Sequence, residues 1–344
     1  MTRLVVIADD LTGALDAAAP FAARGLVTLV ALGLEGLQEA LASGADVVGV
    51  STDSREIAPD AARQAVAACV AKLPAGVAIF KKVDSRLKGN IAAELEAIPF
   101  GRALAIPAIP AFGRWVRDGK LGGFGVAAPI DVAGRMGREV AVPNAMTQAD
   151  IEQALATIEY DLPIGARGLA EALAQRMAPD AIIRKQSPIT GRVICVIGST
   201  DPITLEQIER LKGARADLDH LTAPDGFVGD LPVSQAPLMV VQATPGNGTA
   251  SNADVAAKLG AVLLALQPAA ETTLVISGGA TAQLVLRALN IEVLELLGEA
   301  LPGLPLARAG GFTIITKSGG FGGPDALVEL LAQAGTEQES QNAP

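Results

Sequence analysis

The first hundred residues alternate between short apolar runs and longer segments of mixed polarity. The apolar runs are rich in Val, Ile, Ala and Leu and have the length of strands; they are residues 4–8, 27–32, 46–51, 77–83 and 103–106. The segments between them have the length and composition of helices; they are residues 11–23, 35–42, 59–73 and 91–98. Short, continuously apolar strands that alternate with helices are typical of a parallel sheet covered on both faces.

The alternation stops after Pro110 and resumes at Arg192. Residues 111–145 are rich in Gly, Pro and Arg without a clear period, so we expect long loops there, which in a compact protein often belong to a binding site. Helical patterns follow at residues 147–159 and 168–177. The second block predicts strands at 193–197, 238–243, 273–276 and 312–315, and helices at 202–211, 253–266, 280–289 and 324–332.

A chain of 344 residues is too long for one domain of average size, so two domains are the natural expectation. The two alternating blocks meet near residue 190. We therefore predict an α/β fold with two three-layer α/β/α domains, mainly parallel sheets and an active site in the inter-domain cleft. The expected domains are residues 1–190 and 191–335, followed by a polar tail at 336–344.

Composition narrows the class of protein. Half of the residues are apolar but only 3% are aromatic, so the core must be aliphatic. A formal net charge of -10 argues against general affinity for nucleic acid or anionic membranes, so a local cluster would have to hold any bound anion. Cys69 and Cys195 are too few and too far apart for a disulfide framework, and we expect buried thiols in a reducing compartment.

The N-terminal region does not resemble a targeting signal. Asp9 and Asp10 fall where a signal peptide would have its apolar core, and no uninterrupted apolar run reaches membrane-spanning length. We therefore expect a cytoplasmic protein without a membrane partner. A homodimer is compatible with the sequence.

Polar side chains follow three strands of the predicted first sheet, at the edge where open α/β folds bind ligands. They are Asp9, Asp10 and Thr12 after the first strand, Arg55 after the third, and Lys82, Asp84, Ser85, Arg86 and Asn90 after the fourth. Lys and Arg can hold a carboxylate or phosphate, and Asp can orient or deprotonate a hydroxyl. We expect a site for a small, anionic, hydroxylated molecule, which Arg114 could reach from the irregular stretch.

Structural roles are the alternative for the same residues. Taken singly, Asp9, Thr12 and Asp53 are also typical helix N-caps. The charged group after the fourth strand could form a solvated loop with internal ion pairs. The convergence of three strand ends on one edge favours the functional interpretation.

Three turns in the second block each follow a strand and open a helix. They are residues 198–202 with Ser199, residues 277–281 with Gly278, Gly279, Ala280 and Thr281, and residues 317–323 with Gly319, Gly320, Phe321 and Gly322. Glycines let the backbone approach a phosphate closely, and helix N-termini present free N–H groups. Three such turns on one sheet edge favour a polyphosphate site. Neither a GxxxxGK[ST] P-loop nor a GxGxxG after the first strand is present.

Hydrolase and metal chemistry have little support in the sequence. His220 is the only histidine and is expected at the surface, so Ser-His-Asp hydrolysis would depend on that residue alone. The sequence contains no Cys/His set with the spacing of a metal site, and metal ligands stay unassigned.

Taken together, these segments resemble the four-carbon acid sugar kinases, the family of D-threonate, D-erythronate and 3-oxo-tetronate kinases. The matching pieces follow the family's order along nearly the whole chain; they are residues 8–14, 51–55, 81–90, 113–114, 198–199 with Thr204 and Gln207, 277–279 and 317–322.

The resemblance implies a first domain that binds the acid sugar, a second that binds the nucleotide, and ATP-dependent phosphorylation of a terminal hydroxyl with Mg²⁺ bridging the phosphates. ATP would lie on Gly278, Gly279, Thr281 and residues 319–322. In the first domain, the substrate carboxylate would be held by Arg55, Lys82 or Arg86, its hydroxyls by Asp9, Asp10 and Asp84, and Asp84 or Asp10 would be the base.

One departure from the family pattern leaves alternatives open. Ala280 stands where the family's nucleotide loop usually has an Asp. A second hypothesis is therefore a protein that senses a sugar acid or nucleotide without catalysis. A third is a kinase for another small hydroxy acid.

Overall fold

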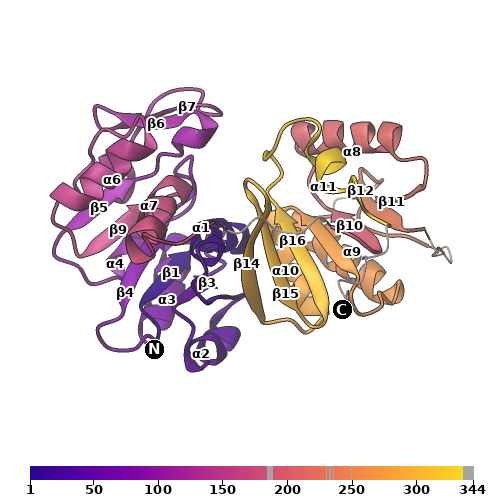
Figure 1. The fold of residues 1–344 in the computed structure, drawn as a ribbon, viewed down its shortest axis with the longest axis horizontal. Coiled ribbons are helices and arrows are strands. Elements are labelled where there is room, and N and C mark those ends of the chain that lie inside the picture. Colours follow the sequence, from indigo (N-terminus) through magenta and orange to yellow (C-terminus); the bar gives the residue numbers. More distant parts are fainter. Residues whose placement is uncertain (184–188, 230, 232–233, 235, 249, 336–344) are drawn as a thin grey trace, which may run out of the picture. The chain divides into compact units, whose positions relative to one another are not determined.

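A computed structural model describes residues 1–183, 189–229, 231, 234, 236–248 and 250–335 (Figure 1). The chain folds into two compact units, Met1–Arg184 and Lys185–Pro344, whereas the sequence placed the boundary after residue 190. The expected polar tail at 336–344 lies outside the described residues. No helix in the described ranges is both long and apolar enough to cross a membrane.

The first unit contains a parallel sheet with the strand order β2-β3-β1-β4-β9-β5. Its strands are β1 Leu4–Ala8, β2 Thr28–Ala31, β3 Val47–Ser51, β4 Ala78–Lys82, β5 Ala103–Ile106 and β9 Leu162–Gly165. The five strands predicted from the apolar runs are confirmed. Every residue of β1, β3 and β5 is buried, which explains why these strands are continuously apolar rather than alternating.

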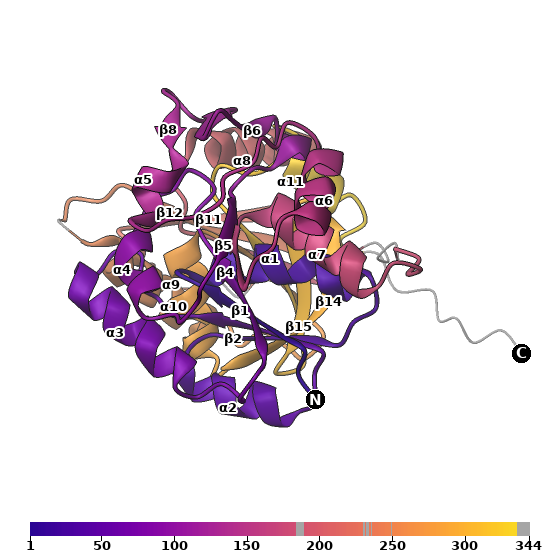
Figure 2. The ribbon, with the colours of Figure 1, turned by 90° about the vertical axis from the view of Figure 1, so that its left-hand side faces the viewer.

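Helices cover both faces of this sheet. They are α1 Leu11–Ala23, α2 Leu34–Ala42, α3 Pro59–Val70, α4 Ile91–Glu96, α5 Val132–Met136, α6 Gln148–Thr157 and α7 Arg167–Met177. Parallel strands connected through a helix make right-handed crossovers, so reversals in strand order put helices on opposite faces. Figure 2 shows α2, α3 and α4 on one side of β1 and β4, and α1, α6 and α7 on the other.

The expectation of long loops over residues 111–145 is wrong in part. This stretch contains the antiparallel strands β6 Arg114–Arg117, β7 Lys120–Gly123 and β8 Ile130–Asp131, followed by α5. Asp118 and Gly119 connect β6 to β7 with φ of 50° and 73°. An Asp-Gly pair with two positive φ angles forms the turn that two-residue hairpins favour, so the sequence did contain the signal.

The second unit contains a sheet with the order β11-β12-β10-β13-β16-β15-β14. The strands are β10 Val193–Ile197, β11 Leu218–Pro224, β12 Leu238–Thr244, β13 Thr273–Ser277, β14 Val293–Leu301, β15 Leu304–Ala309 and β16 Phe312–Lys317, and the helices are α8 Pro202–Ala214, α9 Asn252–Ala265, α10 Gly279–Ala288 and α11 Ala326–Leu330. Neighbouring strands pair in parallel from β11 through β12, β10 and β13 to β16. β15 pairs antiparallel with both β16 and β14.

Besides β6, β7 and β8, four further strands were not predicted from the sequence. β9 includes Pro163, which has no backbone N–H and is rare inside sheets. β11 mixes polar and apolar residues and is only partly buried, as expected for a strand at the edge of its sheet. β14 and β15 form a hairpin, whereas a helix followed by a parallel strand was the pattern in the rest of the chain.

We expect the aliphatic core around Phe80 to dominate the stability of the first unit. Phe80 on β4 is completely buried, whereas the side chain of Phe124 is 62% exposed. Phe80→Ala should lower the free energy of unfolding by about 3–5 kcal/mol through lost burial and a cavity. Phe124→Ala is the matched control and should change it by less than about 0.5 kcal/mol. Urea unfolding followed by fluorescence of Trp115, the only tryptophan, measures both; equal effects would contradict the assigned core.

Candidate functional sites

The predicted residues of the first unit gather at the carboxyl ends of three adjacent strands. β3, β1 and β4 are neighbours in the sheet, and parallel strands lie about 4.8 Å apart. The turns that follow them are therefore brought side by side by the ladder itself.

Arg55 joins two of these turns. Its Nε and Nη2 donate to the two carboxylate oxygens of Asp9, each at 2.8 Å. Its Nη1 and Nη2 also donate to Asp10, at 2.9 and 2.8 Å. Asp10 in turn caps α1 by accepting from the Gly13 N–H at 2.9 Å and from the Thr12 hydroxyl at 2.7 Å. The N-cap alternative is wrong for Asp9, Thr12 and Asp53, because Asp10 caps α1 and Ala58 precedes α3.

The ion pairs with Arg55 keep the Asp9 carboxylate ionised. Burial alone would raise the pKa of Asp9, but the hydrogen bonds and charge of Arg55, together with Lys81 and Lys82, bring it below its usual value. Burial would lower the pKa of Arg55, but the two carboxylates raise it. Because its guanidinium already binds Asp9 and Asp10, Arg55 acts within the protein as their common counter-ion.

Asp84 opens the loop that follows β4. Its Oδ1 accepts from the backbone N–H of Arg86 at 2.9 Å and of Lys88 at 3.3 Å. Burial would raise the pKa of Asp84, but Arg55, Lys82 and these two N–H groups bring it below its usual value. No residue in the described ranges donates a hydrogen bond to the second oxygen, Oδ2. Asp84 therefore presents one free, ionised carboxylate oxygen.

The same loop is fixed against the other two turns. Gly89 has a φ of +85°, and a Cβ there would lie 3.1 Å from Asp9 Oδ2, so a side chain would push on the carboxylate. Asn90 Nδ2 donates to the carbonyl oxygens of Ser54 and Ile57, at 2.9 and 2.8 Å. Arg86, in contrast, is exposed.

Two lysines at the end of β4 have different partners. Lys82 is buried, and its Nζ donates to the Val83 carbonyl at 2.9 Å, close to Gly13 at the start of α1. Lys81 is fully buried, and its Nζ lies 2.8 Å from Oε2 of the equally buried Glu94 on α4. Ser54 donates to the other oxygen of Glu94. This ion pair ties α4 to the turn that carries Arg55.

Arg114 reaches the loop from the small antiparallel sheet. Its Nη1 donates to the Ser85 hydroxyl at 2.6 Å, while Nε and Nη2 donate to the Phe124 carbonyl at 3.1 and 3.0 Å. The structure thus brings together Asp9, Asp10, Thr12, Arg55, Lys82, Asp84, Ser85, Asn90 and Arg114.

In the second unit, β10, β13 and β16 are neighbours and their following turns touch. A Cβ on Gly319 would lie 2.3 Å from the Ser199 hydroxyl oxygen, and one on Gly198 would lie 2.0 Å from the Thr281 hydroxyl oxygen. Gly278 caps α10 with a φ of +109°, which favours glycine. Close approach therefore requires glycine at these positions. Ala280 is exposed in the first turn of α10.

Three buried residues that were not predicted as site residues hold the turn after β16. Thr204 and Gln207 on α8 and Lys317 at the end of β16 are fully buried and donate hydrogen bonds to backbone oxygens of residues 318–323. The signal that could have found them is polarity at positions where the pattern of α8 and β16 requires burial.

Other candidates carry no site chemistry. His220 lies on β11, partly buried, with Nε2 2.8 Å from Gln242 Oε1, so it is a structural partner rather than a ligand. Within the described residues, no three His, Cys, Asp or Glu side chains gather as a metal site would require. Cys69 and Cys195 are buried free thiols, as predicted.

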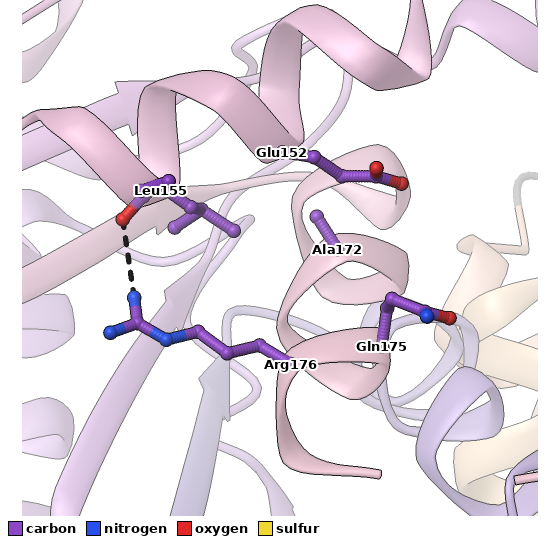
Figure 3. A pocket seen from close by; sticks show the side chains of 6 residues that line it. Glu152, Leu155, Ala172, Gln175 and Arg176 are labelled. Atoms are coloured by element: carbon purple, nitrogen blue, oxygen red, sulfur yellow. Dashed lines mark hydrogen bonds between the residues drawn. The ribbon is translucent and has the colours of Figure 1, made fainter. Parts of the chain in front are cut away.

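A pocket of about 390 Å³ lies between α6 and α7, away from the strand ends (Figure 3). It is lined by Glu152, Leu155, Ala156, Ala172, Gln175 and Arg176. Arg176 donates to the Leu155 carbonyl at 3.1 Å and to the Tyr160 hydroxyl at 3.1 Å. None of the predicted site residues lines this pocket.

Comparison with known proteins agrees with this division. The model of a sugar-binding N-terminal domain matches residues 4–131, and that of a nucleotide-binding C-terminal domain matches residues 232–327. A D-threonate kinase of Bordetella bronchiseptica is 30% identical over 96% of this chain and 96% of its own. The chain belongs to the four-carbon acid sugar kinase family.

Other relatives in the family differ in substrate. A 3-oxo-tetronate kinase of Methylobacterium radiotolerans is 27% identical over 94% of this chain and 97% of its own. A D-erythronate kinase of Heliobacterium modesticaldum is 38% identical over 35% of this chain and 29% of its own. The chain is thus a member of a kinase family whose named substrates are four-carbon sugar acids.

Solved structures share the fold. A protein from Salmonella typhimurium LT2 has a TM-score of 0.75 at 19% identity, covering 95% of this chain and 98% of its own. A Haemophilus influenzae protein has a TM-score of 0.68 at 21% identity, covering 95% and 99%.

The Lys81–Glu94 pair should be essential for the stability of the first unit. Lys81→Met leaves the Glu94 carboxylate buried without its counter-ion, which should lower the free energy of unfolding by about 3–5 kcal/mol. Arg63→Met breaks an exposed pair with Asp60 and should cost less than about 1 kcal/mol. Urea unfolding monitored by Trp115 fluorescence compares them, and similar small losses for both would show that Glu94 does not depend on Lys81.

Proposed function

We propose that the protein is an ATP-dependent kinase that phosphorylates the terminal hydroxyl of a four-carbon sugar acid. The observation that carries the proposal is the chemistry of two separate strand-end sites. One combines ionised carboxylates with lysine and arginine, and the other consists of glycine turns and helix N-termini. The first suits a hydroxylated acid and the second suits a polyphosphate.

Asp84 is the proposed catalytic base. General-base catalysis needs an ionised acceptor within hydrogen-bond reach of the attacking hydroxyl. Asp84 keeps its charge because its pKa is lowered, and its Oδ2 has no donor among the described residues. Asp10 is a weaker candidate, since both of its oxygens already accept hydrogen bonds from Arg55 and from the start of α1.

For the substrate carboxylate, the geometry favours Lys82 and Arg86 over Arg55. Two carboxylates already neutralise the Arg55 guanidinium, and a third would leave excess negative charge. Lys82 Nζ donates to one acceptor among the described residues and has two further N–H groups, and the Arg86 side chain is exposed. Arg55 holds the Asp9 and Asp10 carboxylates in place. Substrate hydroxyls could donate hydrogen bonds only to the lone pairs of these oxygens that Arg55 does not use.

ATP is proposed to lie on the turns that carry Ser199, Gly278–Thr281 and Gly319–Gly322. Because the described chain gathers no cluster of metal-ligating side chains, Mg²⁺ would be held chiefly by the phosphates and water, as is usual for this ion. Bound there, Mg²⁺ would supply neutralisation of phosphate charge. The protein residues contribute positioning, which dominates phosphoryl transfer.

Transfer also sets a requirement on the catalytic complex. The attacking oxygen and the γ-phosphorus must come within about 3–3.5 Å of each other. The proposal therefore needs the sugar-acid site and the nucleotide site to face one another when both substrates are bound.

A coupled assay for ADP with Mg²⁺, ATP and a panel of D-threonate, D-erythronate, 3-oxo-tetronate and other hydroxy acids tests the proposal. Product mass identifies the phosphorylated acid. Ala280 favours one competing outcome, since the usual carboxylate is missing from the first turn of α10. In that case the panel would stabilise the protein against heat without forming ADP, and the protein would be a sensor.

Asp84→Asn should lower kcat by about 10²- to 10⁴-fold, the range expected for loss of a general base. The Kd for ATP should not change, because Asp84 belongs to the first unit. Asp118→Asn, in the exposed β6–β7 turn, is the matched control and should keep full activity. Steady-state kinetics with calorimetric binding measure both, and retained turnover in Asp84→Asn would remove this residue from the mechanism.

A further inference from the structure

The turn after β16 has its carbonyl groups bound from one side by buried side chains. Lys317 Nζ donates to the carbonyls of Ser318 and Gly319, at 3.2 and 3.0 Å. Thr204 donates to the Gly319 carbonyl at 2.7 Å. Gln207 donates to the carbonyls of Phe321 and Gly323, at 3.1 and 2.8 Å. The backbone acceptors of this turn are thus directed toward the protein interior.

Three amide N–H groups of the turn have no acceptor among the described residues. Phe321 donates its N–H to the Ser318 carbonyl at 3.1 Å. No residue in the described ranges accepts a hydrogen bond from the N–H of Gly319, Gly320 or Gly322. A row of free N–H groups on a glycine turn is an anion-binding arrangement. Holding the carbonyls inward is what leaves the N–H groups available to an anion.

Within the described chain, Lys317 is a buried cation held by neutral groups alone, as Lys82 also is, in contrast to Lys81 and Arg55. Its side chain is completely buried, and its Nζ also donates to the Thr204 hydroxyl at 2.8 Å, so three uncharged oxygens receive its three N–H bonds. Among the described residues it forms no ion pair, whereas Lys81 has Glu94 and Arg55 has Asp9 and Asp10. A buried charge without a counter-ion is costly, so a structural role alone would be served by an apolar side chain.

We propose that Lys317 is a positioning residue for the nucleotide. Its ammonium holds the turn so that the N–H groups of Gly319, Gly320 and Gly322 face the phosphates, and the bound phosphates supply negative charge beyond that of Asp201, the nearby carboxylate. This inference rests on the proposed function, in that it assigns the glycine turn to ATP.

If the charge of Lys317 supports nucleotide binding, the binding should depend on pH. Burial lowers the pKa of Lys317 to about 8, and Asp201 at the start of α8 partly opposes this. The groups that contact Lys317 from the turn and α8 are uncharged oxygens, and its ladder partner on β13, Ser277, is also uncharged. Bound phosphates favour the protonated form and raise the pKa. Nucleotide binding should therefore take up protons near pH 8 and weaken as the pH rises above 8.

The test is isothermal titration calorimetry of ATP with Mg²⁺ at pH 8 in two buffers of different ionisation enthalpy. Wild-type protein should take up about half a proton per nucleotide, since about half of Lys317 is unprotonated at its pKa. Lys317→Met should abolish this uptake and raise the Kd by about 10- to 100-fold. Lys258→Met, an exposed lysine on α9, is the matched control and should behave as wild type.

Thr204→Val provides a second variant if Lys317→Met fails to fold. It removes one donor to the Gly319 carbonyl and one acceptor of Lys317 Nζ but keeps the lysine, so the Kd should rise by about 2- to 10-fold while proton uptake persists. Equal Kd values for wild type, Lys317→Met and Thr204→Val, or wild-type binding that does not vary between pH 7.5 and 9.5, would overturn the inference. Failure of wild-type protein to bind ATP at all would instead overturn the proposed function.

Discussion

Parallel strand pairing is the constraint on which both sites depend. Strands β1, β3, β5, β10 and β13 are buried along their whole length, so polar side chains gather where the strands end. In the first unit this edge collects carboxylates and cations from β1, β3 and β4. In the second it collects glycines and hydroxyls from β10, β13 and β16. The ladder supplies the convergence, and the residues after each strand determine the chemistry.

The two edges stabilise buried charge in different ways. In the first unit, Arg55 and Lys81 each have carboxylate partners, whereas Lys82 has only a backbone carbonyl among the described residues. In the second, Lys317 has only neutral oxygens around it. An unmatched cation creates a local preference for anions in a chain whose net charge is -10.

Much of the fold followed from the sequence, because parallel strands buried on both faces leave an unambiguous apolar signal. The bounds of β1, α1 and β5 match the predicted ones. β11 and the β14–β15 hairpin were missed, since edge strands and hairpins carry mixed polarity that competes with turn and helix patterns. The irregular stretch was misjudged because Asp118-Gly119 was not recognised as a hairpin turn.

The candidate sites were predictable as regions but not as interactions. Which residues follow the strands could be found from the order of elements. The pairing of Arg55 with both Asp9 and Asp10 could not be found in this way. An arginine that follows a strand can bind either a ligand or a neighbouring carboxylate, and the sequence does not distinguish the two. Lys317, Thr204 and Gln207 could be noticed as polar residues at buried positions, but the backbone oxygens that they bind could not be found from the residue types.

The hydrogen bond from Arg114 to Ser85 has a consequence for how this family can diversify. Strands β6, β7 and β8 form their own ladder, so their residues can vary without shifting the register of the parallel sheet. The loop after β4 nevertheless touches this small sheet directly. Changes in this accessory sheet can therefore reshape the surroundings of Ser85, while the strand ends that carry Asp9, Asp10 and Arg55 keep their positions.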